Sequence, residues 1–268
     1  MKILITGGAG FIASHVTDKY IEEGHDVVIV DNLTTGKEIN INPKAKFYKI
    51  DIQDDLDVIF KTEKPDIVNH HAAQMNVRVS VDNPIKDAKT NIMGLINLLK
   101  TSVKYNVKKF IFVSSGGVVY SEDNIFPIKE TGKKEPKSPY GITKYTGEQY
   151  VKFFAKTYGL KYSILRYSNV YGPRQNPKGE AGVISIFSTL MLKNEQPIIF
   201  GDGLQLRDYV YVQDVVELNV KVLTMGDNEP YNVGTSVETD VNQIFDFIKE
   251  ITEYQGNAKQ GSRRRFHR

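Results

Sequence analysis

Short apolar runs alternate along the chain with stretches in which apolar residues recur every three or four positions. The runs are rich in Val, Ile and Phe, which favours strands, and the periodic stretches favour amphipathic helices. Strands are expected at 2–6, 26–30, 46–50, 66–70, 110–115 and 161–167. Helices are expected at 11–24, 55–63, 85–105 and 139–158. This alternation predicts an α/β fold of the Rossmann type, a doubly wound parallel sheet with helices on both faces.

Beyond Tyr167 the pattern is less regular, with neither repeats nor a low-complexity linker. A loop at 172–182 precedes a helix at 185–192, a strand at 196–200 and helices near 212–225 and 239–253. We therefore expect a first domain over residues 1–168 and a smaller C-terminal region over 169–268, part of which crosses back to the sheet.

Composition is ordinary for a globular protein, with 40% hydrophobic and 25% charged residues in 268. No run reaches membrane-spanning length and Met1 leads directly into a strand pattern, so we expect a cytoplasmic protein. With no cysteine, the chain has no thiolate nucleophile and no cysteine-based metal site. The net charge of +3 depends on four arginines within the last eight residues; without them the chain carries 31 basic and 32 acidic residues. We interpret that end as a solvated terminus and expect no nucleic-acid partner.

The segment TGGAGFIASH, residues 6–15, follows the first strand and opens the first helix. Glycines there allow backbone N–H groups to approach a pyrophosphate, and the helix N-terminus adds partial positive charge. The last glycine of the usual fingerprint is replaced by Ala13, an accepted variant at a position that serves helix–strand packing. The segment therefore predicts a dinucleotide site.

An acidic residue follows at the distance that this site requires. Asp31 ends the second strand, about 20 residues beyond the turn, where a carboxylate accepts hydrogen bonds from ribose hydroxyls and repels a 2′-phosphate. This favours NAD over NADP as the cofactor. The alternative is that Asp31 only caps a turn with Asn32. Asp51, after the third strand, is expected to bond the adenine amino group, or to be an ordinary acid at a strand end.

SPYGITKYTGEQY, residues 138–150, places Ser138 and Pro139 at a helix start and Tyr140 and Lys144 one turn apart on one face. We expect the ammonium, together with an oxidised nicotinamide, to lower the phenol pKa from about 10 toward neutrality. The tyrosinate would then take a proton from a sugar hydroxyl. The spacing alone is weak evidence, because Tyr105 and Lys109 match it across a helix end and a strand.

At this point the chain resembles the extended short-chain dehydrogenase/reductases, and among them the UDP-glucose 4-epimerase-like enzymes. The motifs that carry the resemblance occur in family order to about residue 253: TGGAGFIASH, Asp31-Asn32, NHHAAQ, Asn91, FVSSGGVVY, YGITK, LRYSNVYGPRQ and FGDGLQLRDYVYV. The resemblance implies an NAD-binding first domain and a substrate-binding second region.

It also implies roles for individual residues. The implied catalytic residues are Ser115, Tyr140 and Lys144, with Ser114 open as the alternative hydroxyl because one extra residue precedes Tyr120. The implied cofactor residues are Gly7, Gly10, Phe11, Ile12, Asp31, Asn32, Asp51, Ile52, Ala72, Ala73, Gln74, Asn91, Ser114, Tyr140, Lys144 and Tyr167. The implied substrate residues are Asn169, Val183, Phe200 and Arg207. The plain alternatives are a turn Asn, a buried Phe and an Arg paired with Asp208.

Two further motifs bear on the chemistry. The histidines of NHHAAQ lack metal-ligand spacing, so we expect them to line the sheet edge and predict no metal site. In FVSSGGVVY, Gly116 and Gly117 stand where related 4,6-dehydratases carry Asp-Glu for elimination. The prediction is therefore an NAD-dependent 4-epimerase of a nucleotide sugar. The alternatives are another nucleotide-sugar oxidoreductase, either a reductase or a dehydratase, and a non-catalytic NAD-binding regulatory protein.

Two further expectations concern the oligomeric state and the C-terminal end of the chain. The helices at about 84–104 and 139–158 carry more apolar residues than one sheet face needs, and in the family they pair across a two-fold axis, which predicts a homodimer. The end of the chain, QGNAKQGSRRRFHR, matches nothing in the family. We therefore expect the second region to be truncated at its C-terminus.

Overall fold

The computed structural model describes residues 1–177 and 182–262. Most of the arginine-rich end, which we interpreted as a solvated terminus, lies outside these ranges. The strands are β1 (Lys2–Thr6), β2 (Asp26–Asp31), β3 (Lys46–Lys49), β4 (Ile67–His70), β5 (Lys109–Ser115), β6 (Lys161–Tyr167), β7 (Asn169–Tyr171), β8 (Ile198–Phe200), β9 (Tyr209–Tyr211), β10 (Glu229–Val233) and β11 (Lys259–Gly261). The predicted strands of the first domain are all present.

The helices follow the predicted periodic stretches, and the long one at 85–105 is divided by a π-helical turn. They are α1 (Phe11–Glu22), the 3₁₀ turn η1 (Glu38–Asn40), α2 (Asp57–Glu63), α3 (Val77–Asp82), α4 (Pro84–Ala88), the π-helix η2 (Lys89–Met93), α5 (Gly94–Lys104), α6 (Gly116–Val119), α7 (Pro139–Tyr158), α8 (Val183–Leu192), α9 (Val212–Lys221) and α10 (Val241–Ile251). The short helices α3 and α6 were not predicted.

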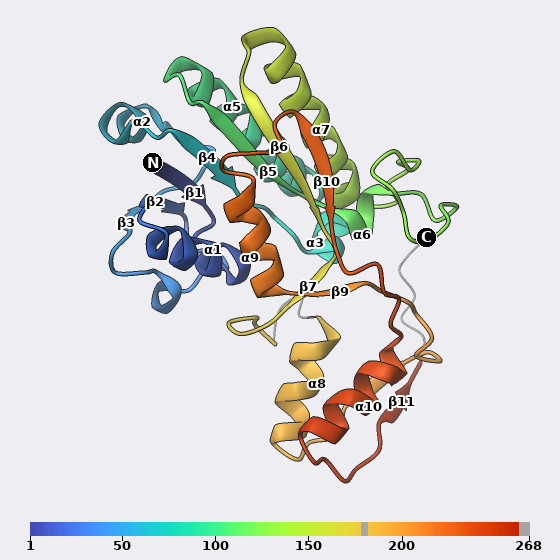
Figure 1. Ribbon diagram of the computed structural model, residues 1–268. Helices are drawn as coiled ribbons and strands as arrows, with labels where there is room; N and C mark the ends of the chain where they lie inside the picture. Colours follow the sequence, from blue (N-terminus) through green and yellow to red (C-terminus); the bar gives the residue numbers. More distant parts are fainter. Residues whose placement is uncertain (178–181, 263–268) are drawn as a thin grey trace.

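Seven strands form one parallel sheet in the order β10-β6-β5-β4-β1-β2-β3 (Figure 1). β1 lies in the interior of this order, with Ile3 paired to Val27 of β2 on one side and to Ile67 of β4 on the other. The chain therefore winds outward to β3 and then crosses to β4. Such a reversal opens a crevice at the carboxyl ends of the central strands, where ligands bind in doubly wound folds. The predicted fold class is confirmed.

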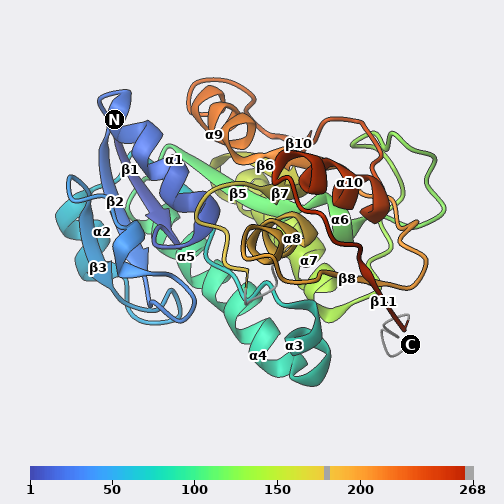
Figure 2. The same cartoon turned by 90° about the horizontal axis from the view of Figure 1, so that it is seen from below.

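Each face of the sheet has its own hydrophobic layer. On one face α1 and α9 pack together over Ile3, Ile5 and Leu165; on the other, α2, α5 and α7 cover Leu4, Val68 and other strand residues. Figure 2 shows these two helical layers from below. Because both faces are covered, strands β1, β2, β4, β5 and β6 are buried over most of their length.

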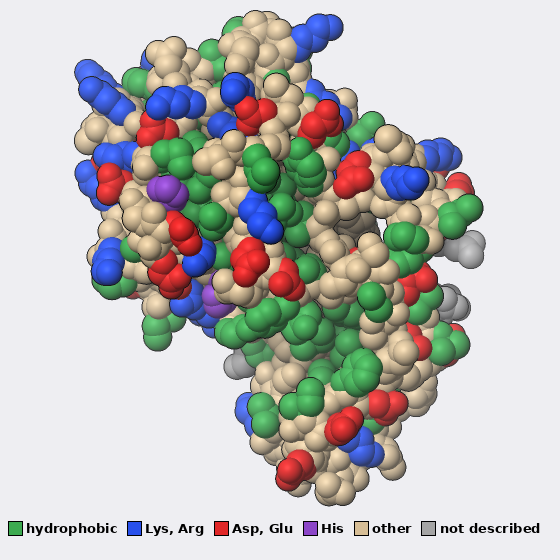
Figure 3. Space-filling view, in the orientation of Figure 1, with side chains coloured by type: hydrophobic (Ala, Val, Ile, Leu, Met, Phe, Trp, Pro, Cys, Tyr) green, Lys and Arg blue, Asp and Glu red, His purple; other side chains and the backbone are tan. Residues whose placement is uncertain are grey.

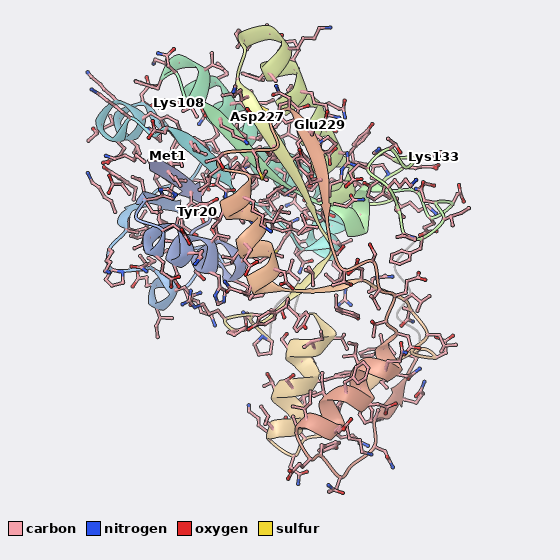
Figure 4. The ribbon with its side chains drawn as sticks, in the orientation of Figure 1. Met1, Tyr20, Lys108, Lys133, Asp227 and Glu229 are labelled. Carbon is pink, nitrogen blue, oxygen red and sulfur yellow. The ribbon has the colours of Figure 1, made fainter. Side chains whose placement is uncertain are left out.

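Part of the chain after residue 168 returns to the sheet. β10 pairs with β6, and Asp227, which precedes it, forms ion pairs with Lys109 of β5 (2.7 Å) and Lys161 of β6 (2.9 Å) (Figure 4). On the other face, Tyr20 of α1 donates a hydrogen bond to the Asn219 carbonyl of α9 at 3.1 Å. These contacts join the returning segment to the first domain.

The other C-terminal elements form a small lobe beside the carboxyl edge of the sheet (Figure 1). It contains α8, α10 and the parallel pair β8–β11, and its own core includes Phe187, Met191, Phe245 and Ile248. The parallel pair β7–β9 lies where the chain passes between the sheet and the lobe. A separate packed lobe therefore lies beside the carboxyl edge of the sheet.

Candidate active site

The predicted glycine turn lies between β1 and α1 and is built around close backbone contacts. Gly7 has φ +72°, and a Cβ there would approach the Ala72 nitrogen to 2.9 Å, so glycine is required on both counts. The Gly10 N–H donates to the Gly7 carbonyl at 2.9 Å, which closes the turn. Two residues of the implied cofactor site, Gly7 and Ala72, thus meet although 65 positions separate them in the sequence.

Helix α1 begins directly after this turn and has no side-chain cap. Gly10 is the N-cap residue, so the first N–H groups of α1, from Phe11 and Ile12 onward, have no side-chain acceptor. Uncapped N–H groups at a helix start are acceptor-seeking and favour an anionic ligand. Ala13 is 2% exposed within the hydrophobic core, which explains why a methyl group is accepted at the position of the missing glycine. The residues present therefore fit a dinucleotide pyrophosphate.

Asp31 is fixed beside this turn. Its Oδ2 accepts from the Ala9 N–H at 3.0 Å and its Oδ1 from the Leu33 N–H at 2.8 Å. The second contact is the turn role considered as the alternative; the first ties the carboxylate to the glycine turn as well. A carboxylate accepts about four hydrogen bonds, so acceptor positions remain for ribose hydroxyls.

Asn32 and Asp51 lie together next to Asp31. The Asn32 Nδ2 donates to Asp51 Oδ2 at 2.7 Å, and Asp51 Oδ1 accepts from the backbone and side-chain nitrogens of Gln53. Ile52 is buried against Gly94, where a Cβ would approach within 2.7 Å of its Cδ1. The structure brings these predicted residues to the same end of β2 and β3.

The residues after β4 are held by side chains of the predicted helix at 85–105. The Gln74 N–H donates to Asn91 Oδ1 at 2.8 Å, and Asn91 Nδ2 donates back to the Gln74 carbonyl at 2.9 Å. Asn91 lies in η2 and is 4% exposed. Asn91 therefore fixes the backbone that follows Ala72 and Ala73, whereas we predicted it only as a cofactor residue.

Helix α7 presents Tyr140 and Lys144 as predicted, and its local sequence explains why it begins where it does. Ser138 Oγ accepts from the Gly141 N–H at 3.1 Å, and Pro139 occupies the first helical position. The Lys144 Nζ is buried, donates to the Val113 carbonyl at 2.9 Å and lies 5.9 Å from the centroid of the Tyr140 ring.

The surroundings of Tyr140 and Lys144 shift both pKa values. The shift of the Tyr140 pKa is opposite to the one predicted from the sequence. Burial raises the pKa of the Tyr140 phenol above its ordinary value, the Asp87 carboxylate acts in the same direction, and a hydrogen bond with Ser115 opposes them. Burial also lowers the pKa of Lys144 to about 8, against the opposing charges of Asp87 and Glu148. The prediction that the protein would lower the phenol pKa is wrong for the chain's own groups, because burial of the phenol and the charge of Asp87 both favour its protonated form.

The adjacent serines of β5 point in different directions, as successive strand residues do. Ser115 contacts the Tyr140 phenol, whereas Ser114 Oγ donates to Glu148 Oε1 at 2.7 Å in the interior. The geometry therefore favours Ser115 over Ser114 as the hydroxyl beside Tyr140.

Of the two histidines of NHHAAQ, His70 ends β4 and is buried, whereas His71 directly follows the strand and is partly exposed. Thr6 Oγ1 and His70 Nδ1 lie 2.7 Å apart, and the ring of His71 packs 6.1 Å from that of Tyr167. Burial lowers the pKa of both histidines, that of His71 to about 3, and the positive charge of Lys144 acts in the same direction. Tyr167 is 4% exposed and accepts from Asn219 Nδ2 at 2.7 Å, so its hydroxyl faces the interior.

The four predicted substrate residues are distributed around the small lobe. Asn169 begins β7, and its Oδ1 lies 3.6 Å from the position of a Cβ on Gly117, two residues after Ser115. Val183 begins α8 and Phe200 ends β8. Arg207 is exposed, donates to the Leu206 carbonyl at 2.7 Å and, among the described residues, forms no salt bridge with Asp208.

An apolar surface adjoins these residues. Leu204, Leu206 and Tyr211 are exposed in the segment around β9. Figure 3 shows hydrophobic side chains gathered where the small lobe meets the sheet. A planar base or a sugar ring could pack against such a surface.

Four buried polar residues around α7 were not predicted. They are Asp87, Thr143, Glu148 and Arg166, all less than 9% exposed. Glu148 follows Lys144 by one helical turn, so the stripe Tyr140–Lys144–Glu148 was a signal that the sequence offered. Asp87 offered none, because a lone acid in PIKDAK is typical of a solvated helix surface.

The described residues contain no cluster of three or more His, Cys, Asp or Glu side chains able to hold a metal ion. None of the described helices is long and apolar enough to cross a membrane.

Comparisons with known proteins agree with this geometry. Residues 3–234 match the NAD dependent epimerase/dehydratase family. The chain is 55% identical over 257 residues to a putative UDP-glucose 4-epimerase of Methanocaldococcus jannaschii, covering 96% of this chain and 84% of the relative. It superposes on the UDP-glucose 4-epimerase of Thermotoga maritima solved with UDP-glucose (TM-score 0.98, 53% identity, 99% and 87% covered). A Thermus thermophilus UDP-glucose 4-epimerase solved with NAD gives a TM-score of 0.93 at 38% identity, with 98% and 87% covered.

Proposed function

Because the chain belongs to the NAD dependent epimerase/dehydratase family, we propose that it is an NAD-dependent isomerase that interconverts nucleotide sugars of the UDP-glucose/UDP-galactose type by 4-epimerisation. The observation that carries the proposal is the position of Tyr140. Its phenol lies beside Ser115 and one helical turn before Lys144, at the sheet edge that also holds the glycine turn. That is the place where a sugar C4 must lie between a base and a dinucleotide.

The cofactor would be held by residues that the structure places along this edge. Gly7, Gly10 and the start of α1 suit the pyrophosphate, and Asp31 suits the adenosine ribose. When bound, NAD would supply the hydride acceptor and donor for C4, and its oxidised form would add positive charge near the phenol. The remaining chemistry is proton transfer by the chain's own side chains.

Tyr140 takes the O4 proton as the C4–O4 double bond forms, and Ser115 bridges O4 and the phenol. Since burial and Asp87 favour the protonated phenol, the transfer depends on positive charge nearby, which Lys144 supplies together with the oxidised cofactor. After the 4-keto sugar has turned its other face, the same proton returns from Tyr140 to O4. No atom is gained or lost over the cycle, so the products are C4 epimers.

The loop after β5 favours epimerisation over elimination. Elimination across C5 and C6 needs an acid and a base beside the active-site hydroxyl. Gly116 and Gly117 follow Ser115 and carry no side chain, and a Cβ on Gly117 would only face Asn169. With no group for elimination at this position, the keto sugar is reduced again.

We assign substrate binding to the crevice between the sheet and the small lobe. Asn169 and Arg207 would bind the diphosphate, since a guanidinium suits phosphate oxygens, and Phe200 and Val183 would line the base pocket. Arg207 is exposed and free of a salt bridge among the described residues, which leaves its guanidinium available.

The direct test incubates the purified protein with UDP-galactose, without added cofactor, and measures UDP-glucose. An epimerase that retains its NAD turns over under these conditions. A product formed only with stoichiometric reduced cofactor would indicate a reductase, and loss of water would indicate a dehydratase. Bound NAD with no product from UDP-galactose, UDP-N-acetylgalactosamine or a UDP-uronate would indicate a regulatory protein.

We further propose that the protein is a homodimer that pairs through α7 and the helices beside it. α3, α4 and α5 pack against α7, and apolar side chains remain exposed on this layer, including Val81, Ile85, Met93 and Phe153. Light scattering should give twice the chain mass at micromolar concentration, and Ile85→Glu should reduce it to the monomer mass. A monomeric parent would contradict the assembly.

A cytoplasmic location is proposed on the ground that NAD and nucleotide sugars are made and used in the cytoplasm. Fractionation of the source cells should recover the protein with cytoplasmic markers. Recovery with the membrane or secreted fraction would contradict this location.

A further inference from the structure

Asp87 of α4 is a carboxylate with no exposed surface and only neutral partners. Its Oδ1 accepts from Gln74 Nε2 at 2.7 Å and Asn91 Nδ2 at 3.1 Å, and its Oδ2 accepts from Thr143 Oγ1 at 2.7 Å. In the part of the chain that the structure describes, no lysine or arginine forms a salt bridge with it. A buried charge without an opposite charge is costly, so its presence requires a reason.

The three donors come from segments that surround the proposed active site. Gln74 follows β4, Asn91 lies in the π-helix η2, and Thr143 lies on α7 between Tyr140 and Lys144. Thr143 Oγ1 also lies 3.0 Å from the Tyr140 carbonyl. Together the three donors hold both carboxylate oxygens, so Asp87 occupies a fixed position against the first turns of α7. π-Helical turns such as η2 are frequent at functional sites.

Lys144 directly follows Thr143 on α7, and the charge of Asp87 acts on its ammonium. It is 4% exposed, and its Nζ donates to a neutral carbonyl. The other carboxylate that acts on it, Glu148, is held by Arg166 through Nε (2.8 Å) and Nη2 (2.6 Å). Asp87 is thus the carboxylate near Lys144 that carries no arginine or lysine partner among the described residues.

We propose that Asp87 is a positioning residue that serves as the buried counter-charge of Lys144 and keeps its ammonium charged beside Tyr140. The inference rests on the proposed function for its catalytic meaning. In this proposal α4, which lies outside the YGITK segment, supplies the negative charge that supports Lys144 within that segment.

The sign of the effect follows from the groups around Lys144. Burial lowers the pKa of Lys144 to about 8, and the charges of Asp87 and Glu148 oppose this. The neighbouring groups that titrate are Tyr140, whose pKa is raised, and His70 and His71, whose pKa values are lowered by burial and by Lys144. The histidines are therefore neutral at neutral pH. Removing the charge of Asp87 must lower the pKa of Lys144 further, so that it loses its proton at lower pH.

Asp87→Asn removes this charge while the surrounding geometry can persist. The amide oxygen can accept from Gln74 and Asn91, and the amide nitrogen can donate to Thr143 Oγ1. The Thr143 hydroxyl can then turn its proton to the Tyr140 carbonyl. Asp82→Asn is the matched control, since Asp82 is an exposed acid at the end of α3.

We expect two measurements on Asp87→Asn to move together. The alkaline limb of kcat/KM for UDP-galactose should shift to lower pH by about one unit, the scale for losing a nearby opposite charge. The NMR titration of ¹³Cε-labelled lysine, with Lys144 assigned through Lys144→Arg, should shift in the same direction without any turnover. Asp82→Asn should leave both curves in place. If Asp87→Asn does not fold, Asp87→Ser, which leaves room for a water, is read by the same titration.

An unchanged Lys144 titration in a folded variant with no charge at position 87 would overturn the inference, whatever the activity. If the parent protein shows no epimerisation, the proposed function fails instead, and the lysine titration still decides the role of Asp87. A shift in the Lys144 titration with an unchanged pH profile of kcat/KM would also overturn the inference, because Lys144 would then not need its charge for turnover.

Discussion

Two buried carboxylates act on Lys144, and they are held in different ways. Glu148 is bound by the guanidinium of Arg166 through two hydrogen bonds and by Ser114 at 2.7 Å. Asp87 is bound by an amide, a second amide and a hydroxyl, all neutral. Their burial is the same, 0% exposure. Equal burial therefore does not imply an equal electrostatic role.

The difference separates a structural task from an electrostatic one. A bidentate arginine cancels most of the field of a carboxylate, so Glu148 chiefly joins α7 to β5 and β6. Arg166 extends the connection, since its Nη1 donates to the Tyr120 hydroxyl (2.7 Å) and to the Glu130 carbonyl (2.9 Å). Neutral donors hold Asp87 without cancelling its charge, which remains available to Lys144.

The largest expected effect is on Tyr140, the phenol beside Lys144. Tyr140→Phe removes the hydroxyl that exchanges a proton with O4, and turnover should fall by about 10² to 10⁴. NAD should still bind, because the glycine turn and Asp31 are untouched. Tyr105→Phe, the accidental match at the end of α5, should be nearly silent in the same assay. Full activity in Tyr140→Phe would remove Tyr140 from the proton path.

Breaking the Glu148–Arg166 pair should affect stability most. Arg166→Met leaves an uncompensated buried carboxylate, and the free energy of unfolding should fall by roughly 3–5 kcal/mol. Denaturant unfolding measures the loss. The control is Lys133→Met, which breaks the exposed pair of Lys133 with Glu135 at 2.7 Å and should leave that free energy nearly unchanged, because solvent screens the pair. Equal losses in the two variants would contradict the structural role of the buried pair.

The pH dependence of the parent protein should follow Lys144. Its pKa is lowered to about 8, so the ammonium is charged at pH 7 and loses its proton as pH rises through about 8. We therefore expect kcat/KM to decline above that pH. A profile that stays flat to pH 10 would show that a charged Lys144 is not required.

The smallest effects should distinguish the hydroxyls that donate to the two carboxylates. Ser114→Ala removes the hydrogen bond to Glu148, and Thr143→Val removes the one to Asp87 together with the Thr143 contacts to the Tyr140 carbonyl and Asn91 Nδ2. Each lost bond should reduce the free energy of unfolding by about 1 kcal/mol. Thr143→Val should also give the larger drop in kcat, because Thr143 lies on the turn between Tyr140 and Lys144. The reverse order of kcat values would place the functional carboxylate at Glu148.

The sequence predicts the fold more completely than the site around Tyr140 and Lys144. Helix α7 and strand β6 have the predicted bounds, because Ser138, Pro139 and Gly159 mark the ends of the helix by local chemistry. Local patterns do not reveal which polar residues tertiary packing will bury. Asp87 and Arg166 become informative only when α4, α7 and β6 are brought together, and the shift in the Tyr140 pKa follows from that burial. The short pair β7–β9 was missed for a related reason, since three-residue strands depend on partners elsewhere in the chain.

The most direct test of the proposed reaction is the fate of the hydrogen at C4. UDP-galactose is converted in D₂O by the parent protein without added cofactor, and the UDP-glucose formed is examined by proton NMR. We predict a full C4 proton signal, because this hydrogen leaves and returns as hydride while only the O4 proton passes through Tyr140. Deuterium at C4 would contradict hydride transfer and the proposed function with it.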